Sequence, residues 1–285
     1  MINETEKTTT NAIPTLQLTS DIFFGIVLED IAVCQEVIRI LTGVELEIID
    51  VKSQYSVLQM NNHSVRIDIW AEDKCRNQIG IEMHPQSNED RIRRNRYNIS
   101  SMDIKSLEKG KTYAEAHNIY GIYITKADFL KTKKGINKVV RTIQNTDTSI
   151  PNGIEEYYIS LSCEGDTKEQ TELLKYLKDC EGVVSNKYFP NLVRRVRWLK
   201  EESEGQEVMC EIMDGILKRG IEIGEKRGEE RGESRGERRG VARGKILGAI
   251  DMMRELEYLD TTIEHKLIEK YHISQEKARK YMCVK

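Results

Sequence analysis

The sequence of 285 residues has few prolines and no long apolar run. It contains 4 Pro, and no stretch is both long enough and apolar enough to cross a bilayer. The N-terminal residues lack the basic segment and following apolar segment of a secretory leader. We therefore expect a soluble, cytoplasmic protein without a membrane partner.

The six cysteines show no pattern typical of a metal or disulfide site. No pair has the C-x-x-C spacing of a zinc ribbon, and their wide scatter does not indicate a disulfide framework. We expect them to be reduced thiols. They are Cys34, Cys75, Cys163, Cys180, Cys210 and Cys283.

The chain also lacks a strong charge of either sign. Its net charge of −3 excludes a globally basic nucleic-acid-binding protein, so any contact with DNA must come from local basic clusters. Hydrophobic residues make up 39% and charged residues 32%, which suits a modest core with a large charged surface. A partly extended helical region is therefore expected.

Two stretches, 65–70 and 79–84, alternate apolar and polar residues. Such alternation predicts half-buried strands, with Asp68 and Trp70 on the polar face of the first and Glu82 and His84 on the polar face of the second. The polar residues 71–78 predict a hairpin connection and antiparallel pairing. If Asp68 lies opposite Glu82, their Cβ atoms are roughly 4.5–5.5 Å apart.

Two carboxylates at that distance repel each other unless a cation lies between them. Oxygen ligands of this kind suit Mg²⁺ or Mn²⁺, so the predicted hairpin indicates a metal site. The alternative is a solvated hairpin face whose acidic side chains only keep the sheet soluble, and the spacing alone favours this alternative.

A wider set of motifs resembles one branch of the PD-(D/E)XK nuclease superfamily, the recombination-promoting nuclease or transposase family. The resemblance runs from an opening Asp-x-x-Phe helix to a glycine-rich tail and spans most of the chain. Its matching parts are residues 20–25, 65–69, 81–83, 94–97, the set Asp103, Leu107, Gly110 and Tyr113, residues 119–125, and the Arg-Gly-Glu repeats after Gly220. It implies an α/β, restriction-endonuclease-like core, a central mixed sheet flanked by helices, followed by a mostly helical C-terminal extension.

The resemblance also implies a function and a site. Asp68, Glu82 and the Met83 carbonyl would hold Mg²⁺, or Mn²⁺, and Asp68, Glu82 and His84 would be catalytic. His84 stands where the family usually has Gln and the superfamily Lys, and Gln54 stands near where the family often has Glu. An unperturbed His is mostly neutral at pH 7, whereas Lys is a permanent cation.

The implied activity is a metal-dependent DNA endonuclease that promotes recombination or transposon-like DNA rearrangement. One alternative is a catalytically degraded nuclease-fold protein that acts as an oligomeric or DNA-binding module, and another is a nuclease that acts on RNA. For DNA binding, the best local cluster is on the helix expected after the hairpin, at about residues 90–107. Its members are Arg91, Arg93, Arg94 and Arg96.

We divide the chain into five segments. Residues 1–18 form a polar lead-in that we expect to be disordered, and 19–165 form the nuclease-like domain. A helical extension covers 166–218, a repeat of Gly, Arg and Glu covers 219–248, and a small helical segment covers 249–285.

Glycine occupies every fourth position of the repeat, with one column of arginines and one of glutamates beside it. In a helix, like charges then stack at i,i+4, and each interior glycine costs roughly 1 kcal/mol, so a solitary helix should be marginal. A second copy could place its Arg column against a Glu column, and we expect a homo-oligomer. A flexible charged linker is the alternative. The glycines are Gly220, Gly224, Gly228, Gly232, Gly236, Gly240, Gly244 and Gly248.

Overall fold

The structure is a computed structural model that describes residues 13–57, 65–84, 91–107 and 109–283. The chain forms two compact units, 1–211 and 212–285, and each is described separately. Residues 1–12 of the expected lead-in lie outside the described residues. Ile13–Thr15 form a short 3₁₀ helix, η1, and Ile13 and Leu18 are fully buried, so the packed region includes residues that the sequence assigns to the lead-in.

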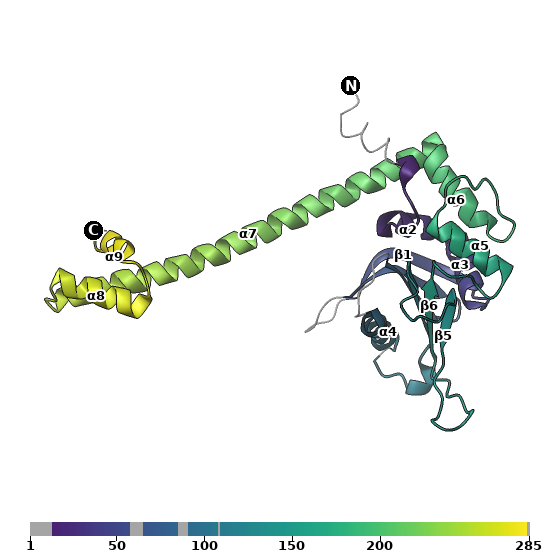
Figure 1. Cartoon of the computed structure of the whole chain (residues 1–285), viewed down its shortest axis with the longest axis horizontal. Helices are drawn as coiled ribbons and strands as arrows, with labels where there is room; N and C mark the ends of the chain where they lie inside the picture. Colours follow the sequence, from purple (N-terminus) through teal and green to yellow (C-terminus); the bar gives the residue numbers. More distant parts are fainter. Residues whose placement is uncertain (1–12, 58–64, 85–90, 108, 284–285) are drawn as a thin grey trace. The chain divides into compact units, whose positions relative to one another are not determined.

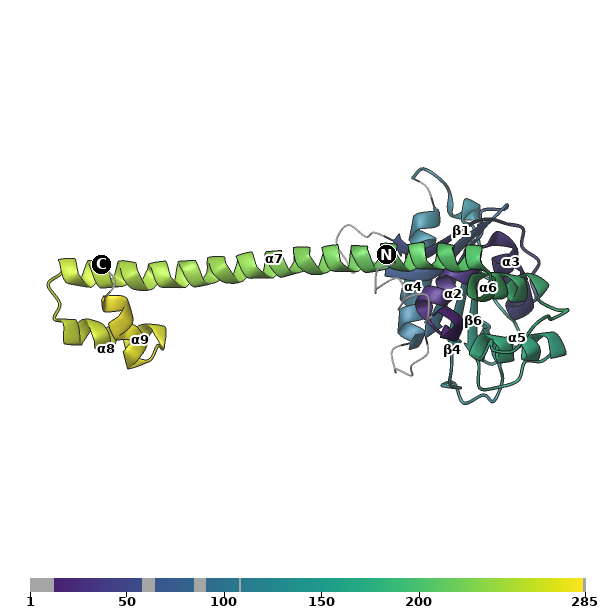
Figure 2. The ribbon, with the colours of Figure 1, turned by 90° about the horizontal axis from the view of Figure 1, so that it is seen from above.

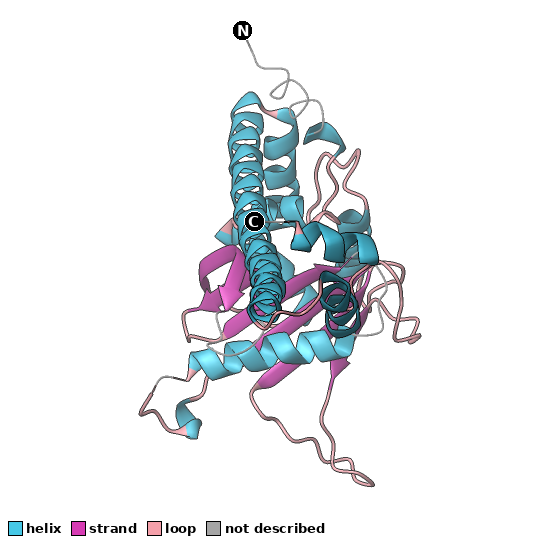
Figure 3. Ribbon diagram, turned by 90° about the vertical axis from the view of Figure 1, so that its left-hand side faces the viewer, coloured by secondary structure: helices cyan, strands magenta, loops and turns pink. Residues whose placement is uncertain are grey.

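The first unit is built on a mixed sheet of six strands in the order β1-β2-β3-β4-β6-β5. Antiparallel pairing joins β1 to β2, β2 to β3 and β5 to β6, whereas β4 is parallel to both β3 and β6. Figure 3 shows these strands with a helix lying across them. Their bounds are β1 Ile48–Val57, β2 Val65–Asp73, β3 Gln78–His84, β4 Ile119–Thr125, β5 Ile136–Val139 and β6 Ile154–Ser160.

Helices cover both faces of this sheet. On one face lie α2 and α3, and on the other lies α4 (Figure 1). The expected fold, a central mixed sheet with flanking helices and a helical C-terminal region, is confirmed. After η1, the helical elements of residues 16–202 are α2 Asp21–Leu28, α3 Ile31–Thr42, α4 Arg91–Ser106, η2 Tyr113–Glu115, α5 Lys168–Lys178 and α6 Pro190–Glu201.

Local sequence explains several of these helix ends. The Asp30 side chain accepts hydrogen bonds from the first backbone N–H groups of α3, and Gly43 ends that helix in the left-handed conformation at φ 72°. Thr167 and Gln170 form a capping box at the start of α5. Pro190 occupies the first turn of α6, where its missing N–H costs no hydrogen bond.

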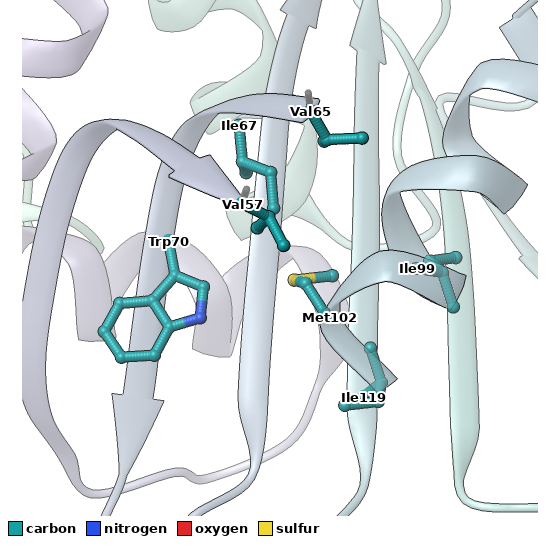
Figure 4. Packing of buried hydrophobic residues seen from close by; sticks show 7 residues of the cluster. All are labelled: Val57, Val65, Ile67, Trp70, Ile99, Met102 and Ile119. Atoms are coloured by element: carbon teal, nitrogen blue, oxygen red, sulfur yellow. The ribbon is translucent and has the colours of Figure 1, made fainter. Parts of the chain in front are cut away.

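Two strand glycines let α4 approach the sheet closely. A Cβ at Gly80 would lie 2.8 Å from the Met102 side chain, and a Cβ at Gly121 would overlap the Ile99 side chain. Figure 4 shows Met102 and Ile99 of α4 in the buried cluster against the strands. The members of this cluster are Val57, Val65, Ile67, Trp70, Ile99, Met102 and Ile119.

The strict alternation expected for β2 is wrong. Trp70 packs in the same cluster as Val65 and Ile67, so the face pattern breaks between Ile67 and Trp70. Opposite this break, Gln54 of β1 adopts φ 49°, and it is missing from the β1–β2 pairing between Ser53 and Tyr55. The strand is also not half-buried, because helices cover both sides of the sheet and Ile67 to Ala71 are all buried.

The connection between β2 and β3 is shorter than expected. The strands extend to Asp73 and from Gln78, so only 74–77 form the turn. The Asp73 side chain accepts hydrogen bonds from the backbone N–H groups of Cys75 and Asn77 and stabilises that turn. The antiparallel pairing itself is confirmed.

The helix α7, Ser203–Glu255, begins in the first unit and contains all eight repeat glycines. In the second unit it is followed by α8, Asp260–Tyr271, and α9, Gln275–Met282. Figure 2 shows α8 and α9 beside the C-terminal end of α7, and a small apolar core joins the three helices. That core consists of Ile246, Ile250, Ile263, Leu267 and Ala278.

None of the helices in the described parts of the chain has the length and apolarity to cross a membrane. All six cysteines are free.

Candidate active site

Asp68 of β2 and Glu82 of β3 are neighbours across the sheet. Ile69 pairs with Ile81, and Asp68 and Glu82 are the next residues in the same register. The backbone N–H of Met83 donates a hydrogen bond to Asp68 Oδ2 at 3.0 Å, which fixes the Asp68 carboxylate against β3. Both residues are buried, with exposed fractions of 7% for Asp68 and 2% for Glu82. A solvated hairpin face, the alternative from sequence, is therefore wrong.

Burial and mutual repulsion disfavour the charged forms of this pair. The pKa of Glu82 is raised to about 8, chiefly by burial and then by the charge of Asp68. The pKa of Asp68 is also raised by burial, although the Met83 N–H and the positive charge of Arg94 act in the opposite direction. The fold thus places the two carboxyl groups so that the pair is more stable with one negative charge than with two.

The Glu82 carboxyl group keeps an unused oxygen. Glu82 Oε2 accepts a hydrogen bond from Arg94 at 3.3 Å, whereas Oε1 is buried and has no hydrogen-bond partner among the described residues. A buried acceptor without a partner costs roughly 1–3 kcal/mol, and a cation between the two carboxylates would remove that cost. The donor set of Asp68 and Glu82 therefore fits a hard divalent cation.

The protein supplies only part of a coordination shell. Among the described residues, no three His, Cys, Asp or Glu side chains are grouped so that they could hold a metal ion together. The two carboxylates would need backbone oxygen or water as further ligands, which is normal for Mg²⁺. The Met83 carbonyl, which the sequence suggests as the third ligand, belongs to the residue whose N–H already binds Asp68.

Asp68 lines an open cleft of about 510 Å³, whereas its neighbour Glu82 is not among the lining residues. The wall of the cleft carries both acidic and basic side chains, from α2, β2, β3 and α4. The lining residues are Asp21, Val65, Arg66, Asp68, Met83, His84, Arg94, Tyr97 and Asn98.

His84 shares this cleft with Asp68. Its ring lies 5.7 Å from the ring of Tyr123 on the neighbouring strand β4. Burial and the positive charge of Arg94 lower the pKa of His84 below its usual value, so the imidazole is neutral at pH 7. A neutral imidazole accepts a proton or binds a metal, but it does not neutralise a phosphate as a lysine would.

The four arginines of the expected DNA-binding cluster do not share one surface. Arg94 contacts Glu82 and lines the cleft, with 49% of its side chain exposed. Arg91 is buried, and its guanidinium group lies 4.9 Å from the ring centre of Phe129. Arg96 lines a different cavity, beside Lys138 and Arg141, and Arg93 is exposed but is not among the residues that line the cleft.

Sequence reasoning assigned no role to several further residues of the cleft, among them Asp21 and Arg66. Asp21 begins α2, and its charge contributes to raising the pKa of Asp68. Arg66, two residues before Asp68, is exposed in the same cleft. The Asp-x-x-Phe motif contained Asp21, but only the packing of α2 on the sheet places it near β2.

A six-stranded mixed sheet with flanking helices fits the restriction-endonuclease-like fold. The family model described as PD-(D/E)XK nuclease family transposase matches residues 40–183, and the chain belongs to that family. The matched segment contains Asp68, Glu82 and His84. No curated protein and no solved structure matches the chain.

Proposed function

We propose that the protein is a metal-dependent DNA endonuclease that hydrolyses phosphodiester bonds. The observation that carries this proposal is the buried pair of Asp68 and Glu82, with one unused Glu82 oxygen. Asp68 lines a cleft whose wall also includes Arg66 and Arg94. Its membership of a nuclease family supports the same activity.

Asp68, Glu82 and the Met83 carbonyl would hold Mg²⁺ or Mn²⁺. When bound, such a cation supplies a nucleophilic hydroxide near neutral pH and stabilises the negative charge that develops on the phosphate and leaving oxygen. The chain itself orients Asp68 through the Met83 N–H and excludes water from Glu82 by burying it.

Arg94 and Arg66 would bind the substrate phosphate, because both residues line the same cleft as Asp68. Arg94 can donate to a phosphate oxygen while it also contacts Glu82, since an arginine has five N–H donors. His84 would accept a proton from the attacking water in its neutral form.

The biological role we propose is promotion of recombination or transposon-like DNA rearrangement, with DNA as the partner and the cytoplasm as the location. The family description supports a nuclease of the transposase type. We further propose that the repeat in α7 joins copies of the chain into a homo-oligomer.

A second candidate is a catalytically degraded protein of the same fold that binds DNA or oligomerises. Two observations favour it. His84 is neutral where a cationic lysine is usual in the superfamily, and Arg94 already pairs with Glu82, so it competes with a metal ion for that carboxylate.

Cleavage of supercoiled plasmid in Mg²⁺ or Mn²⁺ tests the proposal. We expect the wild type to nick or linearise the plasmid, chelation by EDTA to stop cleavage, and Asp68→Asn to lower the rate at least about 100-fold. Glu72→Gln, on the same strand but outside the cleft lining, is the matched control and should cleave normally.

The same assay separates the two candidates. An inert wild type that His84→Gln activates would identify a degraded site and favour the second candidate. If Asp68→Asn cleaves the plasmid as fast as the wild type, the proposed active site is contradicted.

A further inference from the structure

The loop after β4 begins at the same sheet edge as the candidate active site. We call residues 126–134 the lysine loop. Because β3 and β4 are parallel, His84 at the end of β3 is level with Thr125 at the end of β4. Adjacent strands are about 4.8 Å apart, so the first residue of the loop lies close to His84.

The lysine loop is strongly basic. Its only acidic side chain, Asp128, accepts hydrogen bonds from the backbone N–H groups of Thr132 and Lys133 at 3.3 and 2.7 Å. Lys134 is 3.9 Å from Asp166, a distance at which an exposed pair gains little. By contrast, Lys138 just beyond the loop forms an ion pair with Glu155. The four exposed lysines of the loop are Lys126, Lys131, Lys133 and Lys134.

Aromatic contacts connect the loop to the cleft. Phe129 of the loop packs edge-on against Tyr158 of β6, with ring centres 5.6 Å apart. The ring centre of Tyr158 lies 6.2 Å from that of Tyr123, and the ring centre of Tyr123 lies 5.7 Å from that of His84. The buried guanidinium group of Arg91 packs against the Phe129 ring.

The backbone of the loop is also held in place. Thr125 Oγ1 donates a hydrogen bond to the Ala127 carbonyl at 2.8 Å, and Asp128 closes the following turn. A loop that is already ordered loses little conformational entropy when it binds a ligand, so the free-energy cost of ordering its lysines is small.

We propose that the lysine loop binds the phosphate backbone of the DNA that enters the cleft. This inference rests on the proposed function, and it adds a substrate-binding surface outside the cleft lining. Lysines bind phosphates as point charges, so the loop would position DNA without reading its sequence. Binding through the loop should therefore be salt-dependent and similar for different sequences.

Fluorescence anisotropy with a labelled DNA duplex, in Mg²⁺ and over a series of salt concentrations, tests this proposal. All proteins are full-length and carry Asp68→Asn so that the duplex stays intact. The triple variant Lys131→Gln, Lys133→Gln, Lys134→Gln removes three loop charges. Its matched control, Lys168→Gln, Lys175→Gln, Lys178→Gln, removes three charges from α5, where all three lysines are also exposed.

We expect the loop variant to bind at least about tenfold more weakly at low salt and to lower the slope of log Kd against log salt by about 2–3. The α5 control should change affinity less than about twofold. Replacing the same three loop residues with arginine should retain binding because it retains the charge.

Equal loss of affinity in the loop variant and the α5 control would overturn the proposal, as would a protein that does not bind the duplex at all. The plasmid assay decides the proposed function separately. If the wild type binds DNA through the loop in a salt-dependent way but does not cleave it, the lysine-loop proposal is supported and the endonuclease proposal is refuted. If the wild type cleaves DNA and the loop variant binds as tightly as its parent, the endonuclease proposal is supported and the lysine-loop proposal is refuted.

Discussion

Glu82 is the residue whose protonation the fold changes most clearly in the candidate site. Its pKa is about 8 in the folded protein and near 4.5 in an unfolded chain, because burial and Asp68 disfavour the carboxylate. The folded state therefore binds the proton more tightly. The resulting stabilisation is fully present below about pH 4.5 and is lost as the pH rises through about 8.

We therefore predict that Glu82→Gln stabilises the metal-free protein at alkaline pH. At about pH 9 the melting temperature should exceed that of the wild type, with a free-energy difference of at most about 5 kcal/mol, and the difference should shrink towards pH 5. Thermal melts in EDTA at a series of pH values measure this effect. Glu72→Gln serves as control, and a Glu82→Gln effect that is the same at every pH would contradict the pKa assignment.

At the residue scale, the sequence located the acidic pair but not its surroundings. Asp68 and Glu82 stand on adjacent strands with a short connection, so local pairing was enough to bring them together. Asp21 and Phe129 come from segments distant in sequence, and only tertiary packing places them near Asp68 and Arg91. The burial of Arg91 was unpredictable for the same reason.

At the scale of elements, the contact of α4 with the sheet depends on Gly121. We predict that Gly121→Ala destabilises the first unit by about 1–3 kcal/mol, because the new methyl group would overlap the Ile99 side chain. Denaturant unfolding monitored by fluorescence measures the loss.

Ile99→Ala provides the test of mechanism, because it removes the side chain that the new methyl group meets. The double variant should be less destabilised than the sum of the two single variants. Additive losses would show that the cost of Gly121→Ala arises elsewhere.

Elements with strong local signals were predictable from the sequence. β4 coincides with residues 119–125, which the family resemblance singled out, and α4 lies within one residue of the expected helix at both ends. The short edge strand β5, Ile136–Val139, was missed because it is brief, half-exposed and adjacent to a lysine-rich stretch. The break of alternation at Asp68 was also missed, since it accompanies the backbone conformation of Gln54 on another strand.

For the whole molecule, the open question is what the α7 repeat contacts. Among the described residues, apart from each glycine's chain neighbours and the adjacent backbone of α7, no atom lies within 4 Å of a Cβ position on any repeat glycine, so the chain itself provides no close partner for that column. In a helix with 3.6 residues per turn, a column at every fourth position turns about 40° around the axis per repeat. Two such columns can therefore meet only over a few repeats, at a crossing angle near −50°.

We predict opposite effects of alanine on the helix and on its association. Gly228→Ala, Gly232→Ala and Gly236→Ala together should stabilise the isolated helix by about 1 kcal/mol per site and raise helicity by circular dichroism. If copies cross through this column, the added methyl groups should weaken association in analytical ultracentrifugation. Ser234→Ala, in the same segment but outside the column, is the control. A monomeric wild type at every concentration would contradict the proposed oligomer.

The missing β-carbons of Gly80 and Gly121 have a consequence beyond packing. They set how near α4 comes to β3 and β4, and α4 carries Arg94, the counter-ion of Glu82. Any bulk added at these two points would lift the guanidinium away from the acid and leave the carboxyl group to the solvent or to a metal. Substitutions at Gly80 and Gly121, which have no side chain, could therefore change whether the Glu82 carboxylate binds a metal ion or pairs with Arg94.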